Sequence, residues 1–581
     1  MVMSIFSKKS LFVVPVIAAM TAIGCSASNA EQNAPLVYQD IEPTGFAGSY
    51  LASHHAQNSY DWKAASGFLD QVLALDPENA ELIRRSMILA IGTGDLELAA
   101  KRAQTLIVTD PTNDLAYILM TLENIKGEEF DAASETLAQM PEGDMGDFIK
   151  PLLTVWVSAG QGALDTTSLQ ENSIHRYHGA LAAFYLGDFE KAKALATEIL
   201  ASGTISNHDA VRVADILAVT GAHKDALALY EGVMVQDNEN NILAEKIAAV
   251  KADQEKDTNE AIKALVPDAN IESAVKGTAV AMYDMAYILH REYSDSSTKL
   301  FANMALALDG HMTSARLLLA DTLTRNGRYK DAITQLADID PSHPSYLPAQ
   351  RHAAELMAEA GDLDGALAKL NTLFTQYNDI EALIRIGDLY RQEENFKNAL
   401  TAYNKAAKQL GGDTIPAEYW HLLYARGMAY EREGKWNNAE ADLKAALVYQ
   451  PNHPYLLNYL GYGWADQGMN LQESLELIKR AVALRPYDGY IIDSLGWVQY
   501  RMGLYDEALP NLEKAVSLLP YDSTINDHLG DVYWQLGRHT EARFQWERAV
   551  NYSEGETDIS LIEQKLKFGM DGVKNSKQAS K

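Results

Sequence analysis

Apolar residues along this chain follow the spacing of amphipathic helices, and the pattern of each helix pair returns after 34 residues. Ala399, Tyr403 and Ala406 stand at i, i+4 and i+7, which places them on one face of a helix. Pro77 and Pro111 are 34 residues apart, and each of them follows such a stripe. We therefore predict pairs of helices joined by short turns, in which each pair buries its apolar face against the next.

Small residues mark the points where the two helices of a pair cross closely. A glycine on the first helix and an alanine on the second recur at Gly387, Gly427, Gly461, Gly496 and Gly530 and at Ala399, Ala439, Ala508 and Ala542. Between the helices a glycine often precedes an aspartate, as in Gly94-Asp95 and Gly361-Asp362. Glycine ends a helix at low cost in the left-handed backbone region, and aspartate begins one well. This is the tetratricopeptide signature, and it predicts an all-α, tetratricopeptide-repeat superhelical solenoid of about a dozen helix–turn–helix units.

The regularity of the repeats varies along the chain and suggests a division into segments. Residues 141–172 and 241–277 fit the repeat worst, so we expect irregular helix pairs there and a break in the cooperativity of unfolding. The end of the chain carries lysines with few apolar residues, which predicts a frayed tail. The predicted segments are a signal peptide at 1–24, a flexible tether at 25–45, N-terminal tetratricopeptide-like repeats at 46–275, C-terminal tetratricopeptide repeats at 276–553 and a C-terminal tail at 554–581.

The first residues have the pattern of a secretory leader. Lys8 and Lys9 precede an apolar run of 13 residues, Leu11 to Ile23, which is shorter than the roughly 20 residues of a membrane-spanning helix. The run ends in Ala22-Ile23-Gly24-Cys25, which resembles a bacterial lipobox, and Cys25 is the only cysteine of the chain. We expect lipidation at Cys25 and an outer-membrane, periplasm-facing lipoprotein held to the membrane by this lipid anchor. The alternative is ordinary cleavage after Ala30, which would give a soluble periplasmic protein.

The charge balance and the motifs argue against nucleic acid and against catalysis. The chain has 49 Lys and Arg against 79 Asp and Glu, a net charge of −30, without the clustered cations that bind phosphates. His54-His55 and the pair His175 and His178 lack a third ligand at a suitable spacing, so packing or surface roles are favoured over a metal site. Neither a phosphate-binding loop nor a nucleophile elbow is found in the sequence. We predict no enzyme activity, no catalytic residues, no cofactor and no metal.

The first helices of stacked repeats line a concave surface, and some of their positions are not needed for packing. In the last four repeats these positions hold aromatic rings among polar groups, a mixture typical of peptide-binding surfaces. The alternative is that some of the rings pack between adjacent first helices. The predicted protein-binding groove consists of Tyr424, Tyr455, Asn458, Tyr462, Tyr490, Asp493, Trp497, Tyr500, Arg501, Asp527, Asp531 and Trp534. The same count places His421, Met428, Glu431, Arg432, Asp466 and Gln535 on this face.

Three stretches exceed the general repeat pattern: residues 457–462, 493–501 and 525–534. Through them the C-terminal half resembles a proteobacterial family of tetratricopeptide-repeat lipoproteins, one branch of which is the lipoprotein adaptor of a periplasmic carboxyl-terminal processing protease. The resemblance implies a non-enzymatic protein-binding scaffold or adaptor in the bacterial cell envelope. Its partners would be other envelope proteins, such as a periplasmic protease and its substrates, although the resemblance does not single out that protease. Because Trp and Tyr in a groove also stack on sugars, the alternative is a carbohydrate-binding assembly factor for exopolysaccharide or cell wall.

Overall fold

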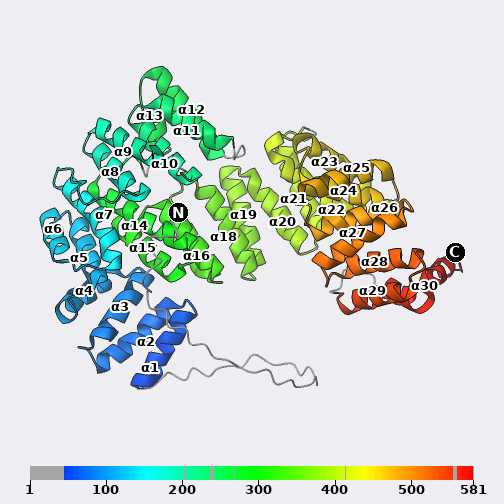
Figure 1. The fold of residues 1–581 in the computed structure, drawn as a ribbon, viewed down its shortest axis with the longest axis horizontal. Coiled ribbons are helices and arrows are strands. Elements are labelled where there is room, and N and C mark those ends of the chain that lie inside the picture. Colours follow the sequence, from blue (N-terminus) through cyan, green and yellow to red (C-terminus); the bar gives the residue numbers. More distant parts are fainter. Residues whose placement is uncertain are drawn as a thin grey trace.

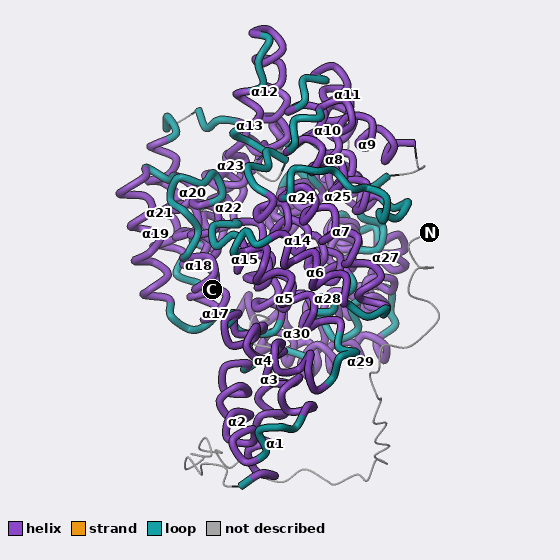
Figure 2. The backbone as a smooth tube through the Cα atoms, turned by 90° about the vertical axis from the view of Figure 1, so that its left-hand side faces the viewer, coloured by secondary structure: helices purple, strands orange, loops and turns teal. Residues whose placement is uncertain are grey.

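A computed structural model describes residues 45–201, 205–235, 241–266, 269–412, 414–553 and 559–579. Cys25, the predicted signal peptide and nearly all of the predicted tether lie outside the described residues, so the predictions made for them are not tested. Within the described ranges every regular element is a helix (Figure 2), which confirms the all-α fold class. None of the described helices is long and apolar enough to cross a membrane.

The first half of the molecule is a curved array of helix pairs followed by two inner helices, α14 and α15 (Figure 1). Its helices are α1 (Phe46–Asn58), α2 (Trp62–Leu75), α3 (Ala80–Thr93), α4 (Leu96–Thr109), α5 (Asp114–Lys126), α6 (Phe130–Gln139), α7 (Asp144–Gly160), α8 (Ser173–Tyr185), α9 (Phe189–Ala201), α10 (Asn207–Val219), α11 (His223–Met234), α12 (Asn241–Lys256), α13 (Glu260–Lys263), α14 (Ala274–Arg291) and α15 (Asp295–Leu308).

The second half continues the array in regular helix pairs, from α16 to the last helix (Figure 1). Its helices are α16 (Thr313–Arg325), α17 (Tyr329–Ala337), α18 (Tyr346–Glu359), α19 (Leu363–Tyr377), α20 (Ile380–Gln392), α21 (Phe396–Gln409), α22 (Trp420–Arg432), α23 (Trp436–Tyr449), α24 (Pro454–Gln467), α25 (Leu471–Leu484), α26 (Gly489–Arg501), α27 (Tyr505–Leu518), α28 (Ser523–Gln535), α29 (His539–Asn551) and α30 (Ile559–Ala579).

The local rules that predict the helix pairs hold in the structure. Gly94 ends α3 with φ 81°, and the side chain of Asp95 accepts a hydrogen bond from the Leu98 amide at the start of α4. At the crossing of α26 and α27, a Cβ added to Gly496 would lie 2.5 Å from Leu512 Cγ. Only glycine therefore allows these two helices to approach so closely.

The concave face of the first half is covered by α14 and α15. These two helices pack together and against the first helices α3, α5, α7 and α8 (Figure 1). Asn303 of α15 donates to the carbonyls of Ile91 and Gly92 at 2.9 and 3.1 Å, and a Cβ on Gly277 of α14 would lie 2.1 Å from the ring of Trp156. The continuous apolar core of this half extends to Leu319, beyond residue 275, where the sequence predicts a boundary between two arrays.

A buried polar cluster fixes α14 inside the first half. Asp284 of α14 is 3% exposed and accepts hydrogen bonds from Arg212 of α10 and from His178 of α8, the latter at 2.9 Å. Trp156 donates from its Nε1 to His178 Nδ1 at 3.2 Å, so the ring proton of His178 sits on Nε2, facing Asp284. Burial lowers the pKa of His178, which keeps the ring neutral. His178 is thus a packing residue with both ring nitrogens in use.

Two segments can be compared with their predicted structure. Residues 141–172 form an irregular unit, as predicted, in which α7 carries the fully buried Leu152, Leu153 and Trp156 into the middle of the core and residues 161–172 are not helical. The end of the chain is not a frayed tail throughout, since residues 559–579 form α30, which packs against α28 and α29. The apolar periodicity of α7 was visible in the sequence, whereas its partner α14 lies more than a hundred residues away and could not be inferred from spacing.

Candidate protein-binding groove

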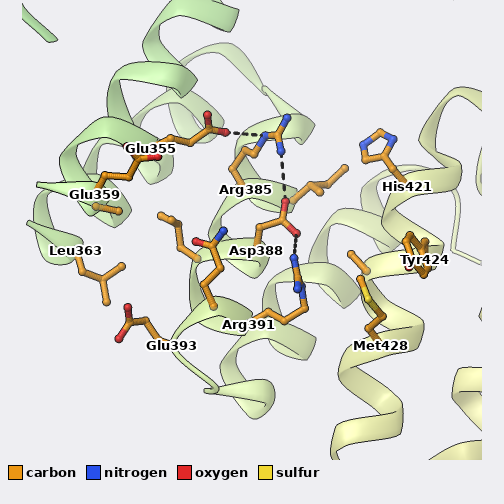
Figure 3. Close-up of a pocket in the computed structure, with 15 residues that line it drawn as sticks. Glu355, Glu359, Leu363, Arg385, Asp388, Arg391, Glu393, His421, Tyr424 and Met428 are labelled. Carbon is orange, nitrogen blue, oxygen red and sulfur yellow. Dashed lines mark ion pairs between the residues drawn. The ribbon is translucent and has the colours of Figure 1, made fainter. Parts of the chain in front are cut away.

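The first helices α18, α20 and α22 line an open pocket of about 680 Å³ on the concave face of the second half (Figure 3). Most of the side chains around it come from the ends of α18 and α20 and from the middle of α22. The pocket is lined by Glu355, Ala358, Glu359, Leu363, Ile384, Arg385, Asp388, Leu389, Arg391, Gln392, Glu393, His421, Tyr424, Ala425 and Met428.

A network of ion pairs crosses the wall of this pocket. Arg385 pairs with Glu355 at 3.1 Å and with Asp388 at 3.6 Å, and Arg391 pairs with Asp388 at 3.6 Å (Figure 3). Asp388 also accepts a hydrogen bond from the Tyr403 hydroxyl at 2.8 Å. Burial, and then this carboxylate, raise the pKa of Tyr403, which therefore stays a donor. The network holds Arg385 and Arg391 in place and neutralises much of their charge.

The pocket as a whole is acidic over an apolar floor. Its lining includes four carboxylates and two guanidinium groups, and no ion pair is formed within the described residues by Glu359 or Glu393, which are exposed at the ends of α18 and α20. Leu363, Tyr424 and Met428 supply the apolar surface. A cationic side chain beside apolar groups matches this surface, because opposite charges complement each other and apolar contact supplies affinity.

A second pocket of about 440 Å³ lies between α22 and α24, so residues of α22 line both pockets. Tyr459 donates to Glu431 at 3.1 Å, while Tyr462, Asp466 and Trp436 complete the wall. Burial raises the pKa of Tyr462, and the carboxylates of Asp466, Asp493 and Glu431 raise it further. The lining of this second pocket holds two carboxylates, Glu431 and Asp466, and one guanidinium group, Arg432.

The structure divides the predicted groove residues into two groups. Tyr424 and Tyr462 line the two pockets, and Tyr455 and Tyr490 are 43% and 58% exposed. Asn458 of α24 is half-buried. These five positions include the surface that a partner can reach directly.

The remaining predicted residues pack against neighbouring helices. Asp493 is 5% exposed and is hydrogen-bonded to His528 Nδ1 at 3.0 Å, while Trp497 stacks on His528 with ring centroids 3.9 Å apart. Arg501 lies over the Trp497 ring and donates to the carbonyl of Asp466. For Trp497 the sequence left packing open as an alternative, and its ring does pack between α26 and α28.

Four predicted groove residues lie under the C-terminal helix. Asp527 and Asp531 bind the ammonium group of Lys565 from α30, and Tyr500 and Trp534 contact its second half. Asp531 is 4% exposed as a result. The sequence gave no sign of this covering, because the tail has no repeat pattern to place it.

The charged pocket residues of α18 and α20 are absent from the predicted site. The outward positions counted for the last four repeats also apply to residues 380–392, where they give Glu381, Ile384, Asp388, Arg391 and Gln392, and all of these except Glu381 line the first pocket. The sequence therefore held this signal in the repeat that precedes the last four, which the prediction of the groove did not include. In contrast, Glu355 and Glu359 follow no such signal, since α18 is an irregular first helix without the marker glycine.

Comparisons with known proteins agree with this fold. Residues 424–489 and 494–555, and separately 380–409, match models of the tetratricopeptide repeat. A TPR repeat-containing protein of Pseudomonas aeruginosa is 30% identical over 179 residues, which span 30% of this chain and 29% of that protein. The match therefore covers under a third of the relative's length.

Solved structures of low identity align with this chain at low TM-scores. The Cut9–Hcn1 hetero-tetramer of the APC/C contains a chain that is 16% identical, with 90% of this chain and 96% of that chain covered at a TM-score of 0.37. A tetratricopeptide repeat protein from Parabacteroides merdae is 18% identical over 44% of this chain and 98% of its own, with a TM-score of 0.34.

The chain thus contains tetratricopeptide repeats at residues 380–409, 424–489 and 494–555, and its described residues form an all-α solenoid of helix pairs. Arrays of this kind serve as protein-interaction scaffolds, and the pockets described above lie on the face that such arrays use for binding. Within the described residues, no group of three or more His, Cys, Asp or Glu side chains could hold a metal ion.

Proposed function

We propose that this protein is a non-enzymatic scaffold or adaptor of the bacterial cell envelope that holds partner proteins in the open groove across α18, α20, α22 and α24. The observation that carries the proposal is the pair of pockets on either side of α22, which are lined by carboxylates and aromatic rings. Rigid rings give contact area at low entropic cost, and the charged groups select among partners.

The setting in the envelope is supported by the sequence at the start of the chain. The apolar run before Cys25 and the lipobox-like Ala22-Ile23-Gly24 are the features of an exported lipoprotein. Other envelope proteins are the partners we propose, among them a periplasmic protease and its substrates. Substitution Cys25→Ala should release the protein from membrane fractions, and an intact mass that begins at Glu31 would contradict lipidation.

The groove is tested by reversing the charge of its unpaired carboxylates. The tagged protein is purified from solubilised envelopes, and the recovered proteins are compared between the native chain and the Glu359→Lys, Glu393→Lys double variant. Partners of the groove should be lost from the variant. Its stability should change by less than about 0.5 kcal/mol, because both side chains are exposed.

A matched control has the same change in net charge elsewhere. Glu135 of α6 and Glu473 of α25 are exposed on second helices, away from the concave face, and the Glu135→Lys, Glu473→Lys variant should retain the partners. Equal loss from both variants would mean that overall charge, and not the groove, governs binding. Recovery of the same proteins from all three chains would refute the groove.

A second candidate is a carbohydrate-binding assembly factor for exopolysaccharide or cell wall. The observation that favours it is the second pocket, where the rings of Trp436, Tyr459 and Tyr462 stand beside Glu431 and Asp466. Aromatic faces with neighbouring carboxylates can stack on and hydrogen-bond to sugars. Recovery of glycan in place of protein in the same purification would favour this candidate over the scaffold.

A further inference from the structure

The C-terminal helix α30 lies on the last part of the concave face, where the sequence predicts an open groove. Ile562 of α30 is fully buried in the cluster that contains Trp546, and Leu566 and Met570 pack against the same cluster. Met570 reaches Tyr500 of α26, with the Tyr500 hydroxyl 4.0 Å from its sulfur atom. The helix therefore spans from the last repeat back to the repeat before it.

The polar contact of α30 is a lysine held by two aspartates. Lys565 is 6% exposed, and its ammonium group lies 2.8 Å from Asp527 carboxylate oxygens and 2.8 Å from Asp531 Oδ1. Asp527 and Asp531 are four residues apart on α28, so both carboxylates face α30 together. Two negative groups surround one positive group, and the site keeps an excess of negative charge.

The course of α30 is interrupted where it meets an aromatic ring. Gly569 has φ 69° and ψ 175°, and a Cβ on it would lie 2.2 Å from the ring of Trp534. Only glycine lets the backbone turn here and lie flat on the indole. Trp534 also stacks on His539, with centroids 4.1 Å apart, so its ring is held as a fixed platform.

A helix that only covered the last repeat would be expected to use apolar side chains for this contact. Moving two carboxylates and an ammonium group out of water is costly, and apolar replacements of buried ion clusters often leave stability unchanged or raise it. A buried cluster of this kind gives little net stability but selects strongly for a partner that brings the matching charge. The contact thus has the chemistry of recognition.

We propose that the surface formed by Tyr500, Asp527, Asp531 and Trp534 is a binding site for a lysine-bearing amphipathic helix, and that α30 occupies this site in the free protein in place of a partner helix of the same chemistry. The partner helix brings a lysine to the two aspartates and apolar side chains to the rings of Trp546 and Tyr500. The inference rests on the proposed role of the groove in protein binding.

The test uses a fluorescein-labelled synthetic peptide of residues 559–579, titrated with the protein and followed by fluorescence anisotropy. In the native chain α30 competes with the peptide. In the Lys565→Ala chain the internal helix loses its ammonium group while the site stays intact, so the peptide should bind at least about tenfold more tightly. Gly569→Val, which drives α30 away from Trp534, should have the same effect through a different contact.

A receptor variant separates exchange from simple loosening of the fold. Asp527→Asn with Asp531→Asn weakens the docking of α30 as Lys565→Ala does, but it also removes the site, so peptide binding should fall to at least about tenfold below that of the Lys565→Ala chain. A peptide in which Lys565 is replaced by Met should bind none of the chains well.

The opposite outcomes overturn the inference. If neither Lys565→Ala nor Gly569→Val raises peptide binding, or if the aspartate variant binds the peptide as tightly as they do, α30 is a fixed cap of the last repeat. That result would leave the proposed scaffold untouched, because the scaffold is tested by Glu359 and Glu393 in a different part of the groove.

Discussion

In the first half of the molecule the concave face of the repeats is covered by α14 and α15, whereas in the second half it is open from α18 to α24 and covered only at its end, by α30. Buried apolar residues from Ala56 to Leu319 form one continuous core, while those of the second half fall into several smaller clusters. The same type of helix pair is therefore used in two ways in the two halves. Where the face is filled, contacts join residues far apart in the chain and favour cooperative stability; where it is open, the face is left for a ligand.

The largest expected effect is a loss of stability in the first half, where α14 and α15 cover the concave face. Asp284→Ala removes the acceptor shared by Arg212 and His178 and leaves a buried guanidinium group unpaired, which should lower the free energy of unfolding of this half by about 3–5 kcal/mol. Urea unfolding followed by hydrogen exchange would measure the loss. Asp388→Ala in the open groove serves as the control and should cost much less, because Asp388 is only half-buried. Equal losses of stability in the two variants would contradict the proposed difference in stability between the two halves.

The two halves should respond to pH in opposite directions. Burial lowers the pKa of His178, and burial, followed by the neighbouring His178, lowers the pKa of His175 to about 4. The unfolded chain then binds more protons below pH 6.5, the ordinary histidine value, so the first half should lose stability as the pH falls from 6.5 towards 4.

At the end of the second half the shifts run the other way. Burial and Asp527 raise the pKa of Asp531 to about 6, and although burial opposes protonation of His528, the carboxylate of Asp493 raises the pKa of His528. Both groups lie on α28 and bind protons more tightly when folded, so the stability of α28 should fall as the pH rises from about 4 through 6 and beyond. Hydrogen exchange at several pH values would resolve the two trends, and parallel trends would refute the assignment. Asp531→Asn should remove the part of this pH dependence of stability that lies below pH 6.

The sequence predicted the repeat fold because its rules are local. Gly94, Asp95 and Gly496 each act on the helix pair in which they stand, and the structure confirms them. Contacts between distant segments could not be inferred in this way. Nothing near Gly277 indicates that it faces Trp156, and nothing in the tail indicates that Lys565 meets Asp527. The 34-residue period therefore predicts which face of the array is concave, but it does not predict which parts of that face are covered by other helices.

A smaller effect should follow from crowding one helix crossing in the second half. In Gly496→Leu the added side chain meets Leu512 and the backbone of Ala508, which should cost about 1–3 kcal/mol. Because contacts there run between neighbouring repeats, loss of hydrogen-exchange protection should stay within α24 to α28. Loss that spread into the first half would show that the two halves unfold as one unit.

The smallest effect on stability, with a clear effect on binding, is expected from the exposed tyrosines of the groove. Trp497 and Tyr500 do not separate the two properties, because both rings are packed. Tyr455 and Tyr490 are 43% and 58% exposed, so Tyr455→Ala with Tyr490→Ala should change stability by less than about 0.5 kcal/mol while reducing the recovery of partners. The matched control, Phe189→Ala with Phe544→Ala, removes rings that are 46% and 56% exposed on the second helices α9 and α29. Thermal melting and purification from envelopes would be run on both pairs. If the control loses partners equally, exposed aromatic area in general binds them; if the tyrosine pair loses none, binding does not use the open end of α24 and α26.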